Sequence, residues 1–359
     1  MTGDPGSVVE RIRKGETILD EDLSGLDCSG LDLSGARFVE VTAWGARFDG
    51  ARLEGASFTD CDLSESRWKG ADLGRANIVQ SRLSGSDFSG VRAPQSRWIR
   101  CDLSGADFSG GDLGRASFAG CRLDSAVFDG ADLLKTVFTD SEFLKNRFRS
   151  ARIEKTVFQK ADLAGALFEG ATFSNPVFLE SSLTGVDLSG ASLPKIQCDG
   201  TNLTGADLTG CMLSLGNFRR ADLTGAKLDG ATAEKAFFVE AVLAKASLKG
   251  ARLSKSSFCR ADLTEADLSG ADLSMGQCAG SVCLRTIFSG ADLSLADLSH
   301  ADLREADLRG AVLTRTNLHR IREDRALFDA SGRALARETD PERARAEDFV
   351  PDSNEPNHS

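Results

Sequence analysis

Apolar residues recur at every fifth position along most of this chain. Reading every fifth residue from Leu23 gives Cys28, Leu33 and Phe38, and the register continues to Leu318 without an insertion or a deletion. This register contains 60 consecutive units, most of them with Leu or Phe at the central position i. A period so short and so strict predicts a repeat architecture.

The five-residue period excludes an α-helix as the repeating unit. Successive centres would advance by about 140° net around a helix, so the apolar residues would be spread over its whole surface. In an extended strand, by contrast, positions i−2 and i point to the same side. A small residue such as Ala36, Ala46 or Ala51 usually occupies i−2, so both positions can face a common interior.

The other three positions of the unit suit a short strand that ends in a tight turn. Position i−1 is often Asp or Arg, i+1 is often Ser or Thr, and i+2 is often Gly or a charged residue. Small polar residues and Gly favour tight turns. The segment from Ala301 to Gly310 shows two such units, ADLRE and ADLRG. Each unit is therefore predicted to form one side of a coil, and the coils to stack as a solenoid.

The residue types at the centres indicate four sides to each coil. Aromatic residues recur at twenty-residue steps in two columns, in which Ile78 is the one non-aromatic member. The columns are Phe38, Phe58, Ile78, Trp98, Phe118, Phe138, Phe158, Phe178 and Phe48, Trp68, Phe88, Phe108, Phe128, Phe148, Phe168. A three-sided coil would mix Leu and Phe in every column, whereas a four-sided coil stacks ring on ring. The units then form about 15 coils and a rod roughly 70 Å long.

Several units resemble the pentapeptide-repeat proteins, whose pattern is A(D/N)LXX. They include Ala71–Arg75 (ADLGR), Ala106–Gly110 (ADFSG) and Ala221–Gly225 (ADLTG). The resemblance covers about five-sixths of the chain. It implies an all-β solenoid, a right-handed quadrilateral parallel β-helix of about 15 coils with short terminal caps. Fold and function separate readily, so the resemblance does not by itself assign an activity.

The β-helix is predicted over residues 21–320, after an N-terminal helical cap over residues 1–20. Within that cap, Ser7–Lys14 has the pattern of a short helix that ends at Gly15. Such a helix would cover the edge of the first coil, whose backbone groups otherwise lack partners.

A C-terminal cap is predicted over residues 321–339, followed by a disordered tail over residues 340–359. The cap pattern fits either a hairpin around Ser331-Gly332 or a broken helix. Either form would cover the last coil with Leu327, Phe328 and Leu335. The tail is charged and contains proline, a composition typical of disorder.

Composition limits the possible partners. The net charge is −11 and the pI is about 5.0, so nucleic-acid binding through a basic surface is not expected. No stretch approaches eighteen apolar residues, so no membrane span is expected. The N-terminus lacks the apolar region of a signal peptide, which favours a cytoplasmic protein.

The nine cysteines are predicted to be free thiols. Eight occupy the inward positions i or i−2, where they replace Leu, Phe or Ala as small apolar residues. These eight are Cys28, Cys61, Cys101, Cys121, Cys198, Cys211, Cys278 and Cys283. Only Cys259, at i+1, faces outward. Cys101 and Cys121 lie one coil apart, close enough for a bridge in principle, but the odd count and the cytoplasmic interpretation favour thiols.

No arrangement typical of an enzyme occurs in the sequence. His300, His319 and His358 lie near the C-terminal end and form no recognisable pair of ligands or bases. Phosphate-binding loops and nucleophile elbows are missing. Cys278 and Cys283 have no second Cys/His pair and fit core packing better than a metal site. The sequence therefore predicts no catalytic residue, no cofactor and no metal.

An apolar column on one side of the rod is the first candidate for a contact with another protein. Position i−1 is apolar in three successive coils, and the column resumes two coils later. Its members are Val137, Val157, Val177 with Leu179 at i+1, and Phe237 with Val239 at i+1. Gln197 and Asn217 interrupt it. Valine suits any exposed strand, but a contiguous apolar area that includes Phe also fits a partner site, and both interpretations stay open.

An acidic segment is the second candidate surface. Between Ala261 and Gly310 the net charge is −6, and Asp262, Asp267, Asp302 and Asp307 share two columns at i−1. Solubility is the simpler interpretation, since Asp is the preferred residue there. The alternative is DNA mimicry, in which carboxylates on a narrow rod occupy a DNA-binding groove.

Taken together, these patterns favour a non-enzymatic rigid β-helical scaffold that binds a protein partner, including a second copy as a homodimer. The family resemblance implies one alternative, because some members mimic DNA and bind DNA gyrase. The chain is longer than such members, and arginines elsewhere dilute its acidity. The opening segment Leu23–Leu33 also resembles pentapeptide proteins associated with type VI secretion clusters, which makes an accessory role there another alternative.

Overall fold

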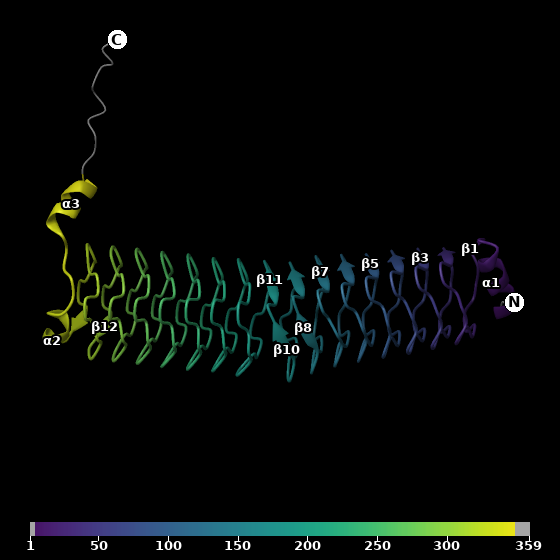
Figure 1. The fold of residues 1–359 in the computed structure, drawn as a ribbon, viewed down its shortest axis with the longest axis horizontal. Helices are drawn as coiled ribbons and strands as arrows, with labels where there is room; N and C mark the ends of the chain where they lie inside the picture. The colour runs from purple at the N-terminus through teal and green to yellow at the C-terminus, as the bar shows by residue number, and fades with distance from the viewer. Residues whose placement is uncertain (1–3, 349–359) are drawn as a thin grey trace, which may run out of the picture.

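The computed structural model of the chain describes residues 4–348 and shows a parallel β-solenoid of about 16 turns (Figure 1). Residues twenty apart are paired in register, as Phe38 with Phe58 and Phe118 with Phe138. Each coil therefore has four five-residue sides, which confirms the predicted fold class. The register extends beyond both predicted ends, because Ile18 pairs with Phe38 and Phe328 pairs with Leu308.

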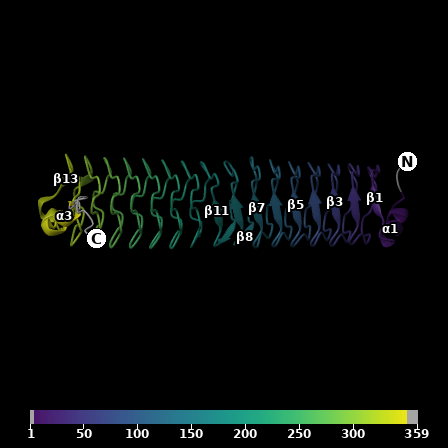
Figure 2. The same cartoon turned by 90° about the horizontal axis from the view of Figure 1, so that it is seen from above.

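One side of the solenoid forms a continuous nine-stranded parallel sheet. Figure 2 shows its strands following one another along the length of the rod, from β1 to β11. We call this side face 1; its centres are Ile18, Phe38 and every twentieth residue after them. Faces 2, 3 and 4 follow in chain order, with centres that begin at Leu23, Cys28 and Leu33. The strands of face 1 are β1 Thr17–Leu19, β2 Arg37–Val39, β3 Ser57–Thr59, β4 Asn77–Val79, β5 Arg97–Ile99, β6 Ser117–Ala119, β7 Val137–Thr139, β9 Val157–Gln159 and β11 Val177–Leu179.

The remaining strands are two short pairs. On face 4, β8 Arg152–Glu154 pairs with β10 Thr172–Ser174, and on face 3, β12 Asp307–Leu308 pairs with β13 Leu327–Phe328. Elsewhere, single-residue parallel bridges at position i−1 join successive coils.

Aromatic rings from faces 1 and 3 fill the interior of the N-terminal half. Within a column the rings stack, with centroids 4.9 Å apart for Phe118 and Phe138 and 5.2 Å apart for Phe108 and Phe128. Across the interior the two columns meet edge to face, as Phe108 and Phe118 do at 5.9 Å. Both geometries are favourable for aromatic pairs. The face 3 column then changes from Phe168 to mainly aliphatic centres.

Aspartate is favoured at i−1 because its carboxylate closes the following turn. Oδ1 of Asp102 accepts the backbone N–H of Ser104 at 3.0 Å, and Oδ1 of Asp222 accepts that of Thr224 at 2.9 Å. This hydrogen bond is local, so it stabilises each corner independently of the neighbouring coils. The corner residue at i+2 adopts a positive φ, which explains the frequent glycine there.

Helix α1 (Pro5–Arg13) covers the N-terminal end of the rod. It begins two residues before the predicted start, because the Asp4 carboxylate accepts the N–H groups of Gly6 and Ser7 as the N-cap. Val8 and Val9 are buried and join the core cluster.

The C-terminal cap differs from both predicted forms. Instead of a hairpin or a broken helix, residues 321–328 continue the solenoid through β13, and a one-turn helix, α2 (Ala330–Arg333), follows. Phe328 is half-buried against the core, whereas Leu327 and Leu335 are exposed, contrary to the prediction that all three cover the last coil. The five-residue phase explains the first two cases, since Phe328 lies at a centre and Leu327 at i−1.

The tail predicted to be disordered from residue 340 contains helix α3 (Pro341–Asp348) instead. Hydrogen bonds from the N–H groups of Glu342 and Arg343 to the Asp340 carboxylate cap its first turn. Residues 349–359, the rest of that prediction, lie outside the described residues. Among residues 4–348, no helix is long and apolar enough to cross a membrane.

All nine cysteines are free, as predicted. Eight are buried, and Cys259 is half-buried on the surface of face 1. Burial raises the pKa of the Cys28 thiol to about 11 and that of Cys283 to about 12. Thiols with such pKa values stay protonated at neutral pH, so these cysteines act as core side chains.

We expect Phe138→Asp to lower the free energy of unfolding by about 4 kcal/mol or more, because Phe138 is fully buried between the rings of Phe118 and Phe158. Thr139→Asp in the same strand is the control, since Thr139 points outward and should change stability little. Chemical denaturation of both variants measures the difference. An equal loss in the two variants, or a helix-dominated circular dichroism spectrum of the wild type, would contradict a β-helix with an aromatic core.

Candidate protein-contact surface

Face 1 is the least charged side of the solenoid. Over fifteen coils, 5 of its 30 outward residues at i−1 and i+1, from Arg37 to His319, are charged as Asp, Glu, Lys or Arg. The corresponding numbers are 12, 19 and 13 of 30 on faces 2, 3 and 4. Charged residues are depleted at the centre of protein interfaces, so face 1 has the composition that best fits such a contact.

The predicted apolar column lies on face 1. Val137, Val157 and Val177 are paired in register on β7, β9 and β11, and Leu179 lies on β11 beside Val177. All four side chains are half-buried. The prediction that these residues stack in one column therefore agrees with the geometry, whereas their role as a contact site stays a prediction.

Phe237 lies farther along the same face and is the most exposed member of the candidate surface. Gln197 and Asn217 separate it from Val177, and the Asn217 side chain donates a hydrogen bond to Gln197 at 3.3 Å. Half of the Phe237 surface is accessible to solvent, 50% by area. The column is therefore divided into a valine part and a phenylalanine part by two polar residues.

A shallow hollow of about 580 Å³ lies around Phe237. Val239 and Leu215 add apolar area to it, and Arg219 and Arg260 contribute cationic groups. The sequence pattern did not indicate Leu215, which occupies a corner position of face 4. The corner residues with a positive φ are usually Gly or charged in this chain. An apolar leucine at such a corner is therefore the sequence signal that could have indicated Leu215.

The four predicted acidic residues lie in two columns that apolar residues interrupt. Val282 is bridged between Asp262 and Asp302, and Ile287 is bridged between Asp267 and Asp307. Carboxylates within each column are therefore two coils apart, roughly 10 Å at the spacing of β-strands. The sequence did predict the shared columns. The apolar residue between the two aspartates of each column, however, prevents their carboxylates from forming a continuous row.

Turn formation and ion pairs also occupy these carboxylates. Each of the four aspartates accepts the backbone N–H two residues later, as in the other units. Arg304 and Arg322 approach Asp302 to 2.7 and 3.4 Å, and Arg309 approaches Asp307 to 2.7 Å. The hydrogen bond from Arg304 lowers the pKa of Asp302, and that from Arg309 lowers the pKa of Asp307. These two carboxylates stay ionised but are partly neutralised by their own neighbours.

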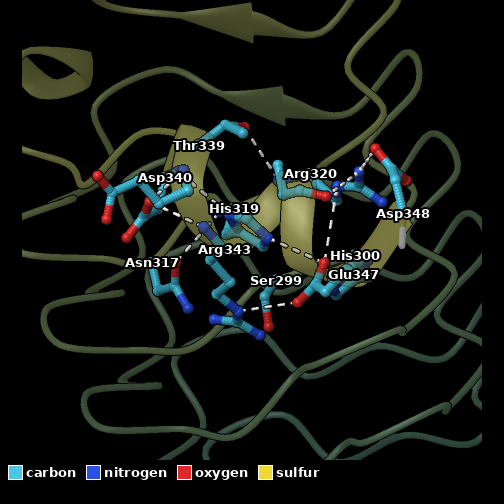
Figure 3. Close-up of polar contacts among 12 residues, drawn as sticks. Ser299, His300, Asn317, His319, Arg320, Thr339, Asp340, Arg343, Glu347 and Asp348 are labelled. Carbon is cyan, nitrogen blue, oxygen red and sulfur yellow. Dashed lines mark hydrogen bonds and ion pairs between the residues drawn. The ribbon is translucent and has the colours of Figure 1, made fainter. Parts of the chain in front are cut away.

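Two histidines that form no recognisable pair in the sequence meet at the C-terminal end of face 1 (Figure 3). His300 and His319 are nineteen residues apart, one residue less than a coil. The twenty-residue period therefore already predicts that they lie near each other on adjacent coils. Their Nε2 atoms lie 3.4 and 3.1 Å from the same carboxylate oxygen of Glu347, on α3. The hydrogen bond from His319 lowers the pKa of Glu347 to about 2.

These three side chains have the residue types of a metal site. Their hydrogen bonds, however, fit better a contact that holds α3 against the last coils. The backbone N–H of Asp340 donates to Nδ1 of His319 at 3.2 Å. A neutral His319 therefore carries its proton on Nε2, the atom that would have to bind a metal ion. This N–H donates a hydrogen bond to the Glu347 carboxylate. Because His319 is only 1% exposed, this pair attaches α3 firmly to the last coils.

The repeat matches the family model for pentapeptide repeats in eight copies. The matched residues are 22–55, 56–92, 101–143, 181–220, 221–258, 241–274 and 280–322. Together they cover well over half of the chain, and they leave residues 144–180 unmatched. No curated protein sequence matches the chain.

Solved structures with similarity to the chain include several repeat proteins. The plasmid-mediated fluoroquinolone resistance protein QnrB1 is 24% identical over 59% of this chain and 93% of its own, with a TM-score of 0.31. HetL, involved in heterocyst differentiation regulation in the cyanobacterium Nostoc, is 25% identical over 86% and 95%, with a TM-score of 0.19. A pentapeptide-repeat protein of the Arabidopsis thaliana thylakoid lumen is 35% identical over 31% and 67%, with a TM-score of 0.13.

These TM-scores are low, so the family assignment depends on the match of the repeat sequence to the family model over more than half of the chain. The chain belongs to the pentapeptide-repeat family.

Proposed function

We propose that this protein is a non-enzymatic rigid scaffold that binds a protein partner, or a second copy of itself, through face 1. The observation that carries the proposal is the low charge of face 1 combined with the exposed Phe237 at its hollow. Aromatic residues in such hollows are frequent energetic centres of protein interfaces.

The geometry of the rod supports a scaffold. Face 1 is a nine-stranded sheet continuous from β1 to β11, and its outward side chains project from a backbone fixed by the coil-to-coil ladder. A partner that binds such a surface loses little free energy to ordering of the scaffold. The arginines at the hollow, Arg219 and Arg260, favour a partner whose apolar anchor has acidic neighbours.

We expect Val157→Arg and Phe237→Ala each to weaken association roughly tenfold or more, by placing a charge in the contact or by removing its anchor. Val312→Arg is the matched control, because Val312 occupies position i−1 on face 4 and is also exposed. Light scattering measures self-association, and pull-down with purified candidate partners measures hetero-association.

Equal association of all three variants and the wild type, with unchanged circular dichroism spectra, would contradict the proposal. The outward residues of face 1 would then be ordinary exposed strand positions. A loss in light scattering alone would identify the partner as a second copy of the chain.

DNA mimicry is the second candidate function, and the net charge of −6 between Ala261 and Gly310 is the observation that favours it. A mimic must present carboxylates at a spacing and a density like those of phosphates. Arg304, Arg309 and the intervening Val282 and Ile287 reduce that density here. We therefore place the scaffold first.

Replacing Asp262, Asp267, Asp302 and Asp307 together with Asn tests the mimicry. Asn keeps the side-chain oxygen that closes each turn, so the fold should persist while four charges are lost. We expect DNA supercoiling by gyrase to be equally unaffected by the wild type and by the quadruple variant. Inhibition by the wild type alone, weakening as salt rises from low to physiological levels, would establish mimicry instead.

A further inference from the structure

In the middle of the rod, the ladder between two successive coils is interrupted along two adjacent faces. In the coils on either side, the N–H of Phe148 donates to the carbonyl of Leu167 at 2.7 Å, and that of Leu188 donates to Asp207 at 2.9 Å. The equivalent bond from Phe168 to Asp187 is missing among the described residues. The equivalent bonds from Gly165, at the corner between faces 2 and 3, and from Gly170 and the other donors of faces 3 and 4 up to residue 175 are missing as well among the described residues.

The same two coils remain joined on the other two faces. On face 2, the N–H of Leu163 donates to the carbonyl of Ser182 at 2.8 Å, and on face 1, that of Phe178 donates to Gln197 at 2.7 Å. The coils therefore separate on faces 3 and 4 only. This leaves two facing rows of backbone groups, residues 165–175 and 184–194, without their usual partners in the described part of the chain.

A cleft of about 630 Å³ opens between the two rows, and Phe173 of β10 is among the residues that line it. Its apolar lining includes Phe168, Phe173, Val186 and Leu188, which belong to the interior of the solenoid. Phe173 and Ala171 are partly exposed, whereas the face 4 centres of the neighbouring coils are buried. The cleft therefore exposes part of the core.

The sequence contains two physical reasons for this opening. Phe173 is the only aromatic centre of face 4, where the other coils have Leu, Ile or Ala, and its ring lies 5.8 Å from that of Phe168. Pro176 lacks the N–H that most other coils use to close the corner after a face 4 centre, as Ile196 does to Leu193 at 3.2 Å. Residues 144–180, which include this coil, are also the longest internal stretch outside the family match.

We propose that this cleft binds an extended segment of a partner protein, with alternating apolar and cationic residues, by β-augmentation. An extended polypeptide carries alternating donors and acceptors along both of its edges, so it can pair with both open rows at once. Alternate side chains of an extended segment point to opposite sides, so one set would reach Phe168 and Phe173 while the other faces solvent. This site is independent of face 1.

The acidic charge at the mouth of the cleft indicates which residues the bound segment carries at its solvent-facing positions. Glu169 and Asp187 are exposed and line the cleft. Arg149 lies 3.3 Å from Glu169. Asp187 uses Oδ1 to accept the N–H of Ser189, and its second carboxylate oxygen is the one available to a ligand cation. Lys or Arg at the solvent-facing positions of the segment therefore complements the mouth.

Hydrogen exchange measured by NMR tests the open rows in the full-length free protein. We expect the amides of Phe168 and Gly170 to exchange at least tenfold faster than those of Phe148 and Ser150, which occupy the same positions one coil earlier and are hydrogen-bonded. Equal protection of the two pairs would show that the ladder is closed and would overturn the proposal.

An octapeptide of alternating Val and Lys, with blocked termini, is the binding probe, and its fluorescence anisotropy is the readout. We expect binding, protection of the Phe168 amide, and at least tenfold weaker binding of the same peptide N-methylated at alternate residues. N-methylation removes backbone donors and keeps every side chain, so undiminished binding would indicate a simple apolar ligand site and overturn the assignment. No binding at millimolar peptide would overturn it as well.

Two variants locate the site. Ala171→Trp should fill the cleft and weaken peptide binding at least tenfold, whereas Ala164→Trp, outward on face 2 of the same coil, should not. Asp187→Lys keeps the cleft open and should weaken binding several-fold by repulsion of lysine. Circular dichroism confirms that each variant is folded. Wild-type affinity in both Ala171→Trp and Asp187→Lys would place the peptide elsewhere and overturn the proposal.

Discussion

The register of backbone hydrogen bonds between residues twenty apart is the interaction on which the rest of this structure depends. Once the N–H groups at positions i−1, i and i+2 reach carbonyls one coil away, every side chain is assigned to a column, either inside or outside. Inward columns must then hold residues that stack, and the rings of Phe108 and Phe128 satisfy that requirement. Outward columns are free to vary, so any binding specificity must lie in them or where the register fails.

The sequence predicted most of the fold for this reason, because the five-residue phase alone assigns Val157 outward and Phe158 inward. It failed where the phase no longer controls the chain. The helix α3 depends on the Asp340 cap and on the contact between His319 and Glu347. The second is a tertiary contact, which the composition of residues 340–359 alone cannot predict. The prediction for Leu327 was wrong because the five-residue phase continues beyond Leu318 and places this side chain at the outward position i−1.

The candidate surfaces were predictable to different degrees. Columns such as Val137 to Val177 follow from counting, and the structure adds their half-buried environment. Leu215 near Phe237 depends on how a corner projects its side chain, which the repeat pattern does not specify. The cleft at Phe173 depends on whether one oversized ring is accommodated or separates two coils. That outcome is a balance between packing and hydrogen bonding, and the residue type alone does not determine it.

The interruption between the coils of Phe168 and Leu188 also affects how the molecule unfolds. In a linear repeat protein each coil is stabilised by its neighbours, and cooperativity passes along the chain through those interfaces. An interface that keeps only two of its four sides transmits less of that coupling. We therefore expect the stack of aromatic coils before it and the mainly aliphatic stack after it to behave as two thermodynamic blocks of one continuous rod, able to lose structure at different temperatures.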